Sequence, residues 1–515
     1  MKLTHWIFLA LFFFSLSAFA QNPDNALGYY FDALRYTNTQ FGGSARFQGI
    51  AGANTALGGD PTAALTNPAG LGFIRRTEML FSTSVNFTNA NTSFINNSTP
   101  DSRTNLNINQ IGVVLGTDRG SDADLRGTAF AITFTRNNDL NRQWSYSGLN
   151  DRNNIISSFL AGSGGSVSWN EFDDEVRNGI FTLSGMAYAT RLILPDLNDP
   201  TNARNQYVTF VPIRPTEQRE KITEIGSQNQ WNLSYAINYK DMLYIGAGIG
   251  IPTIRYNRTK EYSEIPQANS PLNGLRLRER LSQSGIGINA SFGVILRPVD
   301  YIRFGASIIT PTIYSVNDNY DADLSVSYNN YTIIEIVNGV EVPVVLRDLN
   351  ARTILLQSQY NMRTPMRING GVAIFLGKRG FISGDVEMVD YSGVRFSNPQ
   401  PVFNMESDNA VIKLIYRSAI NIRLGSEFRF GTFRIRGGYA MYGSALKEDI
   451  PAPEGKMTFI TGGLGKRTDR SYIDFVVSYR ASQSSYRPYL LRGAEPTAIT
   501  DNTRLTATFT FGIFF

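Results

Sequence analysis

The sequence predicts an all-β fold, a transmembrane antiparallel β-barrel of about 14 strands. Three observations support this prediction. The chain begins with an export signal, it contains many segments of roughly ten residues that alternate apolar and polar side chains, and it ends on an aromatic residue within such a segment.

Residues 1–20 have the pattern of a cleaved signal peptide. Lys2 precedes an apolar run from Trp6 to Leu16, and small residues follow up to Ala20. The run is shorter than the roughly 20 apolar residues of a membrane-spanning helix, and it ends in an A-x-A cleavage site. We therefore expect Sec export with cleavage after Ala20. The alternative is a retained N-terminal anchor.

The composition argues against most classes of enzyme. The chain has no cysteine, and its single histidine, His5, lies in the predicted signal peptide. A Ser-His-Asp triad, a cysteine nucleophile and histidine or cysteine metal sites are therefore not expected, and we predict no cofactor. The 48 basic and 43 acidic residues are mixed along the chain. This favours a solvated surface over a nucleic-acid site.

The alternating segments carry the barrel prediction. In 231–240, apolar residues from Trp231 to Tyr239 occupy the odd positions, and small or polar residues occupy the even ones. Because successive strand residues point to opposite faces, one face can meet lipid and the other a polar lumen. A soluble β-sandwich also alternates. Charged residues recur on the polar face of segment after segment, and segments of roughly 9–11 residues favour the barrel.

The connections between the segments alternate between short and long. The predicted strands are 78–88, 108–117, 127–136, 229–240, 243–256, 283–297, 301–316, 353–377, 381–394, 411–430, 432–443, 456–466, 471–481 and 503–515. The long connections, rich in Asn, Ser, Asp and Pro, are 89–107, 137–228, 257–282, 317–352, 395–410, 444–455 and 482–502. Short periplasmic turns and long outer loops are typical of outer-membrane barrels. An even strand count places both termini in the periplasm.

The last predicted strand resembles the signal that the outer-membrane barrel assembly machinery reads. Apolar side chains at odd positions from Leu505 to Phe515 alternate with Thr506, Thr508 and Thr510, and Phe515 ends the chain. Together with the signal peptide, this strand predicts the outer membrane of a Gram-negative bacterium. The expected surroundings are outer-membrane lipid and the assembly machinery.

Residues 21–77 do not alternate. They contain Gly42-Gly43-Ser44-Ala45-Arg46, the pair Gly58-Gly59 before Asp60, and Asn67-Pro68-Ala69-Gly70-Leu71. So many small residues indicate close backbone packing, and Asp60, Asn67 and Pro68 favour turns. By composition alone, this region is either a compact plug or a flexible linker.

The run from Gly42 to Leu71 resembles the N-terminal hatch of the FadL family of outer-membrane hydrophobic-compound transporters, in a Bacteroidetes-type member. Segments 287–311, 364–391 and 422–439 match the family in kind, so the resemblance covers most of the chain. It implies a hatch over 21–77 inside the lumen of a barrel over 78–515. It also implies hatch-gated diffusion of hydrophobic compounds, long-chain fatty acids first, often by a lateral path through the wall. Asn67, Pro68 and Ala69 would then form the gating element of the hatch.

The chain departs from the family pattern in its 137–228 connection, the largest predicted outer loop. Its semi-apolar stretches 155–160 and 180–194 indicate short loop helices, which build either an outer hydrophobic groove or a packed cap. The glycines 246, 248 and 250 fall in a predicted strand with no helix after it, so they do not indicate a nucleotide site.

Three arginines are candidate polar contacts in the lumen. Arg423, Arg434 and Arg436 face inward by the alternation. They either contact a ligand or form salt bridges with Glu427 and Asp385, and the salt bridges are the simpler expectation.

Several other functions fit the same scaffold. A FadL-like accessory barrel of the type IX secretion system would bind cargo proteins, and a relative could carry other lipids or hydrocarbons. A general porin would lack the plug, a TonB-dependent receptor needs a longer chain, and an outer-membrane lipase or protease needs a histidine. We expect hydrophobic small molecules as partners, no nucleic acid, and a monomer.

Overall fold

The computed structural model of this chain describes residues 29–515, apart from 165, 197, 199–205, 214, 268, 338–339, 399–404, 448–454, 490 and 492–494. The predicted signal peptide and residues 21–28 lie outside the described residues.

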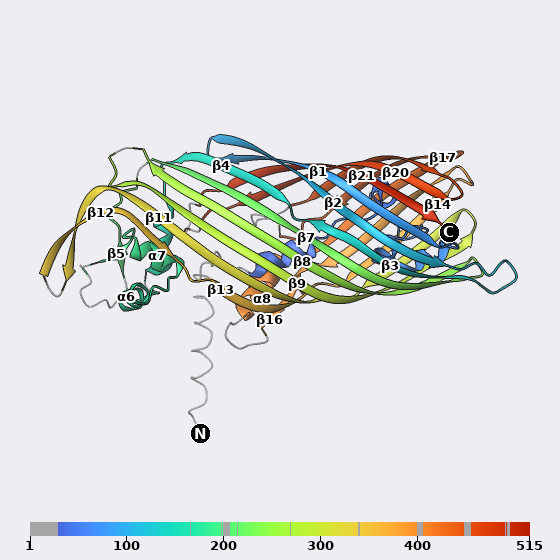
Figure 1. Cartoon of the computed structure of the whole chain (residues 1–515), viewed down its shortest axis with the longest axis horizontal. Coiled ribbons are helices and arrows are strands. Elements are labelled where there is room, and N and C mark those ends of the chain that lie inside the picture. The colour runs from blue at the N-terminus through green and yellow to red at the C-terminus, as the bar shows by residue number, and fades with distance from the viewer. Residues whose placement is uncertain are drawn as a thin grey trace, which may run out of the picture.

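The described strands form a closed antiparallel barrel of 14 strand positions, which confirms the predicted fold and strand count (Figure 1). The wall strands are β1 (Glu78–Phe94), β2 (Asn97–Gly116), β3 (Leu125–Asp139), β4 (Arg142–Asn150), β7 (Thr216–Tyr239), β8 (Leu243–Pro266), β9 (Leu272–Val299), β10 (Ile302–Ile309), β11 (Ile313–Val337), β12 (Val340–Arg352), β13 (Leu356–Arg363), β14 (Arg367–Phe375), β15 (Gly380–Asp390), β16 (Arg395–Ser397), β17 (Ser418–Phe430), β18 (Phe433–Tyr442), β19 (Met457–Arg467), β20 (Ser471–Tyr486) and β21 (Ala498–Phe514). Strands β3 and β4, β10 and β11, β12 to β14, and β15 and β16 each share one position of the ring, because they pair with the same neighbours. The pairing of β1 with β21 closes the barrel, so the wall has no open edge at this level.

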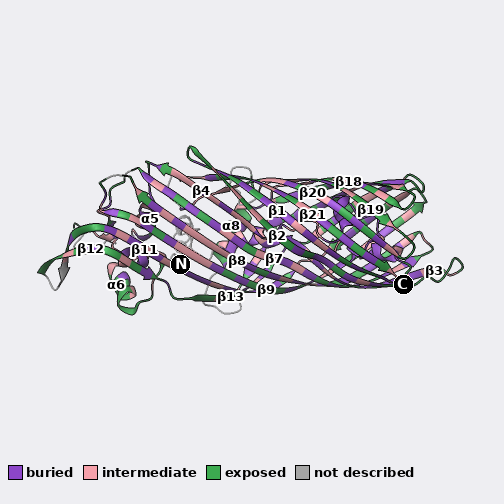
Figure 2. Ribbon diagram, turned by 45° about the horizontal axis from the view of Figure 1, so that its top comes forward, coloured by how far each residue is buried: buried purple, intermediate pink, exposed green. Residues whose placement is uncertain are grey.

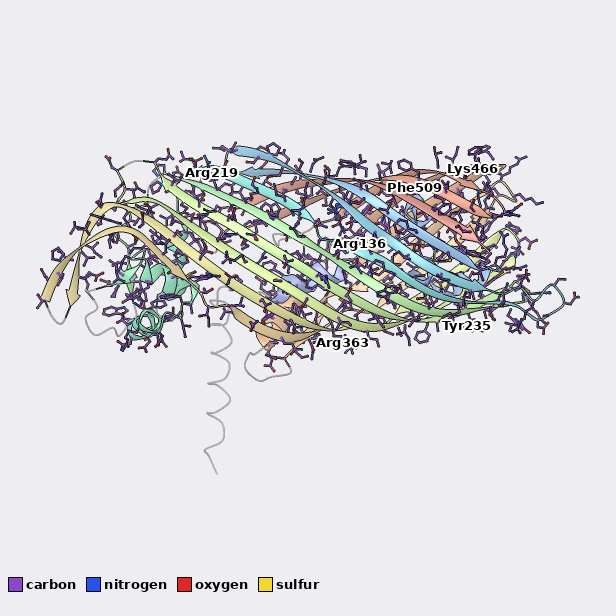
Figure 3. All side chains as sticks on the ribbon, viewed as in Figure 1. Arg136, Arg219, Tyr235, Arg363, Lys466 and Phe509 are labelled. Carbon is purple, nitrogen blue, oxygen red and sulfur yellow. The ribbon has the colours of Figure 1, made fainter. Side chains whose placement is uncertain are left out.

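The outer surface of the wall is apolar. On β7, Trp231 and Tyr235 are 49% and 50% exposed, whereas Asn232 between them is 2% exposed. Tyr235 on β7 and Phe509 on β21 are both exposed on this surface (Figure 3), and the strands alternate between buried and exposed residues along their length (Figure 2). This matches the lipid-facing surface of a transmembrane barrel. None of the described helices is long and apolar enough to cross a bilayer.

The prediction of an outer loop is wrong for four segments, because the strands continue through them. The hairpins β1–β2, β8–β9, β11–β12 and β20–β21 carry paired strands into 89–107, 257–282, 317–352 and 482–502. On the β8, β9 and β11 part of this extension, inward residues such as Tyr262, Leu277 and Tyr320 are buried in an apolar, tyrosine-rich core. The outward face there is largely polar, the reverse of the membrane segment.

The 137–228 connection folds into strand and helix. It contains β4, the two-residue strands β5 (Leu194–Pro195) and β6 (Tyr207–Val208), and the start of β7. It also contains α5 (Ile155–Ser163), α6 (Trp169–Asn178) and α7 (Leu183–Ala189). Helices α5 and α7 confirm the loop helices predicted in 155–160 and 180–194, and α6 lies between these two stretches. Helices α6 and α7 lie beside β11 and β12 at one end of the molecule, and the C-terminus lies at the other end (Figure 1).

One predicted strand is partly helical. Residues 411–415 belong to helix α8 (Glu406–Ile415), and β17 begins only at Ser418. Glu406 and Asp408 in the first turn and Lys413 in the last turn complement the helix dipole, which favours the helix over an extended segment.

Residues 41–74, here called the lumen segment, lie inside the barrel. The segment contains α3 (Ala45–Gly49), α4 (Ala63–Thr66) and the 3₁₀ helix η2 (Pro68–Phe73). Helix α3 contacts β18 to β21, whereas η2 contacts β3, β7, β8 and β9, so the segment reaches across the lumen from one side of the wall to the other. The preceding helix α2 (Tyr29–Thr37) packs against α8 and against η3 (Tyr391–Gly393).

Candidate functional site

The Asn67-Pro68-Ala69 element begins η2 and ties it to two neighbours. The Asn67 side chain accepts a hydrogen bond from the backbone N–H of Ala69 at 3.2 Å and so caps the helix. Its amide nitrogen donates to the carbonyl oxygens of Thr55 at 2.7 Å and Val294 at 3.4 Å. One buried asparagine thus links η2 to the rest of the lumen segment and to strand β9.

Two wall glycines allow this close approach. A Cβ on Gly293 would lie 1.7 Å from Asn67 Oδ1, and a Cβ on Gly246 would lie 2.3 Å from the carbonyl carbon of Pro68. A side chain at either position would collide with the lumen segment. Gly246 belongs to the glycine-rich run that the sequence analysis excluded as a nucleotide site, and its structural role is this contact.

Polar side chains of the wall bind the backbone of the lumen segment on several sides. Asp385 accepts from the N–H of Thr55 at 2.8 Å, and Ser383 donates to the carbonyl of Ala53 at 2.8 Å. From the opposite wall, Thr461 donates to the carbonyl of Gly49 at 3.0 Å. Such bonds satisfy backbone groups that the lumen segment does not pair within itself.

The three predicted lumen arginines lie in different surroundings. Arg436 is buried and binds Glu427 at 2.8 Å and Asp474 at 2.6 Å. Arg423 is also buried, but it pairs with Glu387 at 2.9 Å rather than directly with Asp385. Arg434 is partly exposed at the β17–β18 turn, where it donates to the carbonyl of Gly431 at 2.7 Å. The expected partner is therefore present for Arg436 and different for Arg423.

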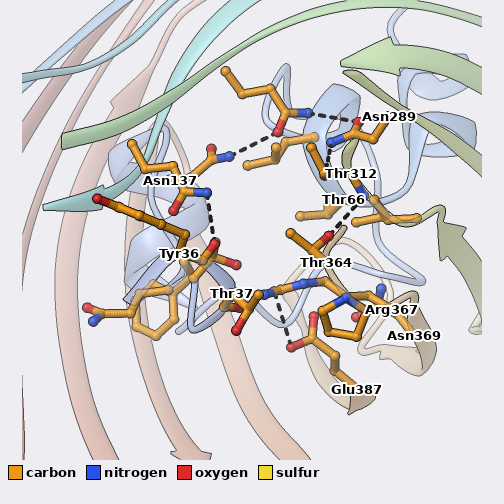
Figure 4. Close-up of a pocket in the computed structure, with 18 of the residues that line it drawn as sticks. Tyr36, Thr37, Thr66, Asn137, Asn289, Thr312, Thr364, Arg367, Asn369 and Glu387 are labelled. Carbon is orange, nitrogen blue, oxygen red and sulfur yellow. Dashed lines mark hydrogen bonds and ion pairs between the residues drawn. The ribbon is translucent and has the colours of Figure 1, made fainter. Parts of the chain in front are cut away.

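A cavity of about 810 Å³, its open mouth included, lies between the lumen segment and the wall. Tyr36 and Thr37 of α2 contribute to its lining, and so does the lumen segment through Phe41, Phe47 and Thr66. Much of the remaining lining is polar and comes from strands and from the breaks between them (Figure 4): Asn137, Gln228, Gln230, Asn289, Thr310, Thr312, Thr364, Arg367, Asn369, Glu387 and Arg423.

The wall beside the cavity is interrupted. Ile309 pairs with Arg367 and Ile313 with Arg363, so the breaks at 310–312 and 364–366 lie opposite each other. The break at 391–394 between β15 and β16 adjoins them. Pro311 and Pro365 have no N–H to donate, so they weaken the ladder at this level. The two Thr-Pro pairs within predicted strands were the sequence signal for this site, which the sequence analysis missed.

Helix α2 is held above the cavity by polar contacts. Asp32 accepts from Tyr360 at 2.7 Å and from Gln283 at 2.6 Å. Asp408 of α8 accepts from the backbone N–H of Tyr30 at 3.3 Å. Burial raises the pKa of Asp408 to about 6, the nearby Asp32 also raises it, and the Tyr30 N–H opposes the rise.

The described residues contain no cluster of histidine, cysteine or carboxylate side chains that could hold a metal ion.

No family model matches the chain, and no curated protein matches it by sequence. Among solved structures, the Pseudomonas putida toluene transporter TodX is 13% identical, with a TM-score of 0.51 over 92% of this chain and 99% of that chain. A Pseudomonas aeruginosa FadL homologue is 11% identical, with a TM-score of 0.51 over 92% of this chain and 98% of that chain. At these identities the likeness establishes the fold, and this chain has the fold of a FadL-type barrel, as its N-terminal motif indicated.

Proposed function

We propose that this protein is an outer-membrane channel for small hydrophobic compounds, long-chain fatty acids among them, and that the lumen segment is its hatch. The apolar outer wall supports a place in the membrane. The single observation that carries the proposal is the lumen segment, which reaches across the barrel between wall contacts on both sides. TodX and the FadL homologue share this fold, and TodX is a toluene transporter.

The interrupted wall supports a lateral exit. At 310–312 and 364–366, the N–H of Thr312 donates to the Thr364 hydroxyl at 2.9 Å, and the N–H of Thr364 donates to the carbonyl of Thr312 at 2.9 Å. Few bonds must break there to open a path toward lipid. A hydrophobic ligand gains about 0.8 kcal/mol for each methylene that stays out of water, so a sideways path into the bilayer needs no energy source.

The Asn67-Pro68-Ala69 element is the proposed gate. Its displacement from the wall requires the loss of the Asn67 hydrogen bond to Val294 and of the apolar contacts that Ala69 makes with Tyr244 and Ile295. A few hydrogen bonds of roughly 1 kcal/mol each can open and close reversibly.

The outer extension favours one alternative function. The β11–β12 hairpin carries exposed apolar side chains, including Ile334, Val340 and Val345, far from the membrane wall. Such a surface suits a protein partner, as an accessory barrel of a secretion system would require.

Uptake of radiolabelled oleate and toluene tests the proposal. Cells that lack their own transporter would express this chain or its Asn67→Ala, Pro68→Ala variant, with surface expression checked. We expect uptake with the chain and an altered rate with the variant, because the gate loses its anchor. A correctly folded barrel that supports uptake of neither compound would contradict transport and leave the protein-binding role to be tested.

A further inference from the structure

The cavity contains polar atoms that have no hydrogen-bond partner among the described residues. They are the Asn137 Oδ1, Gln228 Oε1 and Thr66 Oγ1 atoms. Asn137 and Gln228 are 7% and 2% exposed, so both amides are well buried. A buried polar atom without a partner costs free energy, which a bound group of the right chemistry recovers.

The neighbouring contacts decide which atom of each amide is unpaired. Gln228 Nε2 lies 3.1 Å from the carbonyl oxygen of Tyr36, which can only accept, so this end must be the donating nitrogen. Asn137 Nδ2 donates to Gln230 Oε1 at 3.0 Å, and Gln230 Nε2 donates to Asn232 at 2.7 Å. The unpaired atom of Gln228 is therefore the oxygen, an acceptor, and in the hydrogen-bond network of Asn137 its oxygen is likewise the atom without a partner.

The two arginines of the cavity already have acceptors within the protein. Arg423 binds Glu387 at 2.9 Å, and Arg367 lies 3.8 Å from the same carboxylate. Asp385 lies opposite Arg423 in the strand register, and Arg367 also donates to the carbonyl of Thr37. Both arginines therefore already have acceptors within the protein, and they share the carboxylate of Glu387. A ligand carboxylate would find no unpaired cation, and it would be repelled by the two free amide oxygens.

We propose that this cavity binds the neutral hydroxyl group of an amphiphile, an alcohol or a phenol. The hydroxyl donates to Gln228 Oε1 or Asn137 Oδ1 and accepts from the Thr66 hydroxyl. Apolar side chains of the same cavity, Phe41, Phe47, Leu65, Ile309 and Pro365, receive the hydrocarbon part. The interrupted wall gives that part a way toward lipid. This proposal names the substrate class of the proposed channel and rests on that function.

Binding to purified protein in nanodiscs tests the proposal. The probes are benzyl alcohol, toluene and benzoate at pH 8, which share a ring and differ in the attached group. Equilibrium dialysis against empty nanodiscs subtracts partition into lipid. We expect benzyl alcohol to bind at least about tenfold more tightly than toluene or benzoate, because one or two hydrogen bonds to buried acceptors separate them. Equal affinities, or a preference for toluene or benzoate, would overturn the proposal.

Variants locate the preference in the cavity. Asn137→Leu removes the acceptor and should abolish the preference, whereas Asn137→Asp keeps an acceptor oxygen and should retain it. Gln357→Met, an exposed position on β13, is the matched control and should bind as the original chain does. A preference that survives Asn137→Leu, or disappears in Asn137→Asp with the barrel still folded, would contradict the assignment.

Binding and uptake separate the two proposals. Selective binding of benzyl alcohol without uptake of any hydrophobic compound by cells would count against the channel and not against the site. Uptake without selective binding would count against the site alone.

Discussion

Arg434 and Arg436 lie two positions apart on β18, and the strand alternation assigns them to the same face. Arg436 lies deeper in the barrel, where Glu427 and Asp474 surround it. Arg434 lies at the turn, where it is partly exposed and donates to the backbone carbonyls of Gly431 and Phe433. Two arginines on the same face of one strand are therefore expected to contribute very differently to the stability of the barrel.

We expect Arg436→Met to destabilise the barrel by about 3–5 kcal/mol, because it leaves the buried carboxylate of Asp474 without its ion-pair partner, whereas Glu427 keeps Arg429 and Arg46. Arg434→Met should change stability by less than about 0.5 kcal/mol. Denaturant unfolding of both variants in the same detergent compares them. Equal effects of the two substitutions would show that the buried ion pairs do not hold this part of the barrel.

The two wall glycines allow a second test at this scale. Gly293→Ala places a Cβ against Asn67 Oδ1, so the lumen segment must shift away from β9. We expect a leakier barrel, seen as higher ion conductance in planar bilayers. Gly462→Ala, where a Cβ meets nothing within 4 Å, is the control and should conduct as the original chain does. Unchanged conductance in Gly293→Ala would mean that this contact does not seal the lumen.

The alternation predicted which residues face inward but not which residues pair. Arg436 meets Glu427 because the two are directly opposite across β17 and β18, and it meets Asp474 from β20 across an intervening strand. Arg423 is opposite Asp385 in the ladder, yet its guanidinium reaches Glu387. Strand register and side-chain reach decide these pairs, and a single sequence does not state either.

At the scale of elements, sequence analysis succeeded within the membrane and failed outside it. The membrane segments need apolar side chains on every outward position, so their pattern is strong. Beyond the membrane, Tyr262 and Tyr320 face a tyrosine-rich core and polar residues face water, so the apolar face of the pattern is reversed. The Asn-rich and Ser-rich residues of 89–107 resemble a loop, although they pair as β1 and β2.

The contact between α2 and α8 should depend on pH. The raised pKa of Asp408, about 6, means that the folded protein holds this proton more tightly than the unfolded chain does. The stability that the protonated form provides is complete below about pH 4 and is lost as the pH rises through about 6. Asp408→Asn stays neutral and can still accept from the Tyr30 N–H.

Thermal unfolding measured from pH 5 to pH 8 tests this expectation. The stability of Asp408→Asn relative to the original chain should rise with pH from 5 until the pH has passed about 6, and then stay constant up to pH 8. A constant difference between the two proteins, or one that falls with pH, would contradict a raised pKa at Asp408.

At the scale of the whole molecule, the interior has two parts. The part near the C-terminal end contains the lumen segment, held by polar side chains of the wall, and the part near α6 and α7 contains the tyrosine-rich core (Figure 1). The cavity lies where α2, the lumen segment and the interrupted wall meet. The cavity therefore lies between the outer extension and the part of the wall that faces the bilayer.

The barrel and its strand number followed from the sequence, because closure in lipid constrains every strand. The cavity did not, because α2, β3, β7, β9, β11 and β14 all contribute to it and no local pattern joins them. Thr310-Pro311 and Thr364-Pro365 were visible in the sequence, but only strand pairing shows that the two breaks are neighbours.

Movement of the lumen segment is the central claim, and a reversible cross-link tests it most directly. A Cβ on Gly438 of the wall would lie 2.8 Å from the Cβ of Ala51, so the Ala51→Cys, Gly438→Cys pair can form a disulfide after a small shift. The chain has no other cysteine. Gly112→Cys, Thr133→Cys, with a Cβ separation of 3.6 Å between two wall strands, is the control. Oxidation should stop oleate and toluene uptake only in the first variant, and reductant should restore it. Undiminished uptake through the oxidised first variant would contradict the account, because the compounds would then pass while the lumen segment is fixed to β18 at Ala51.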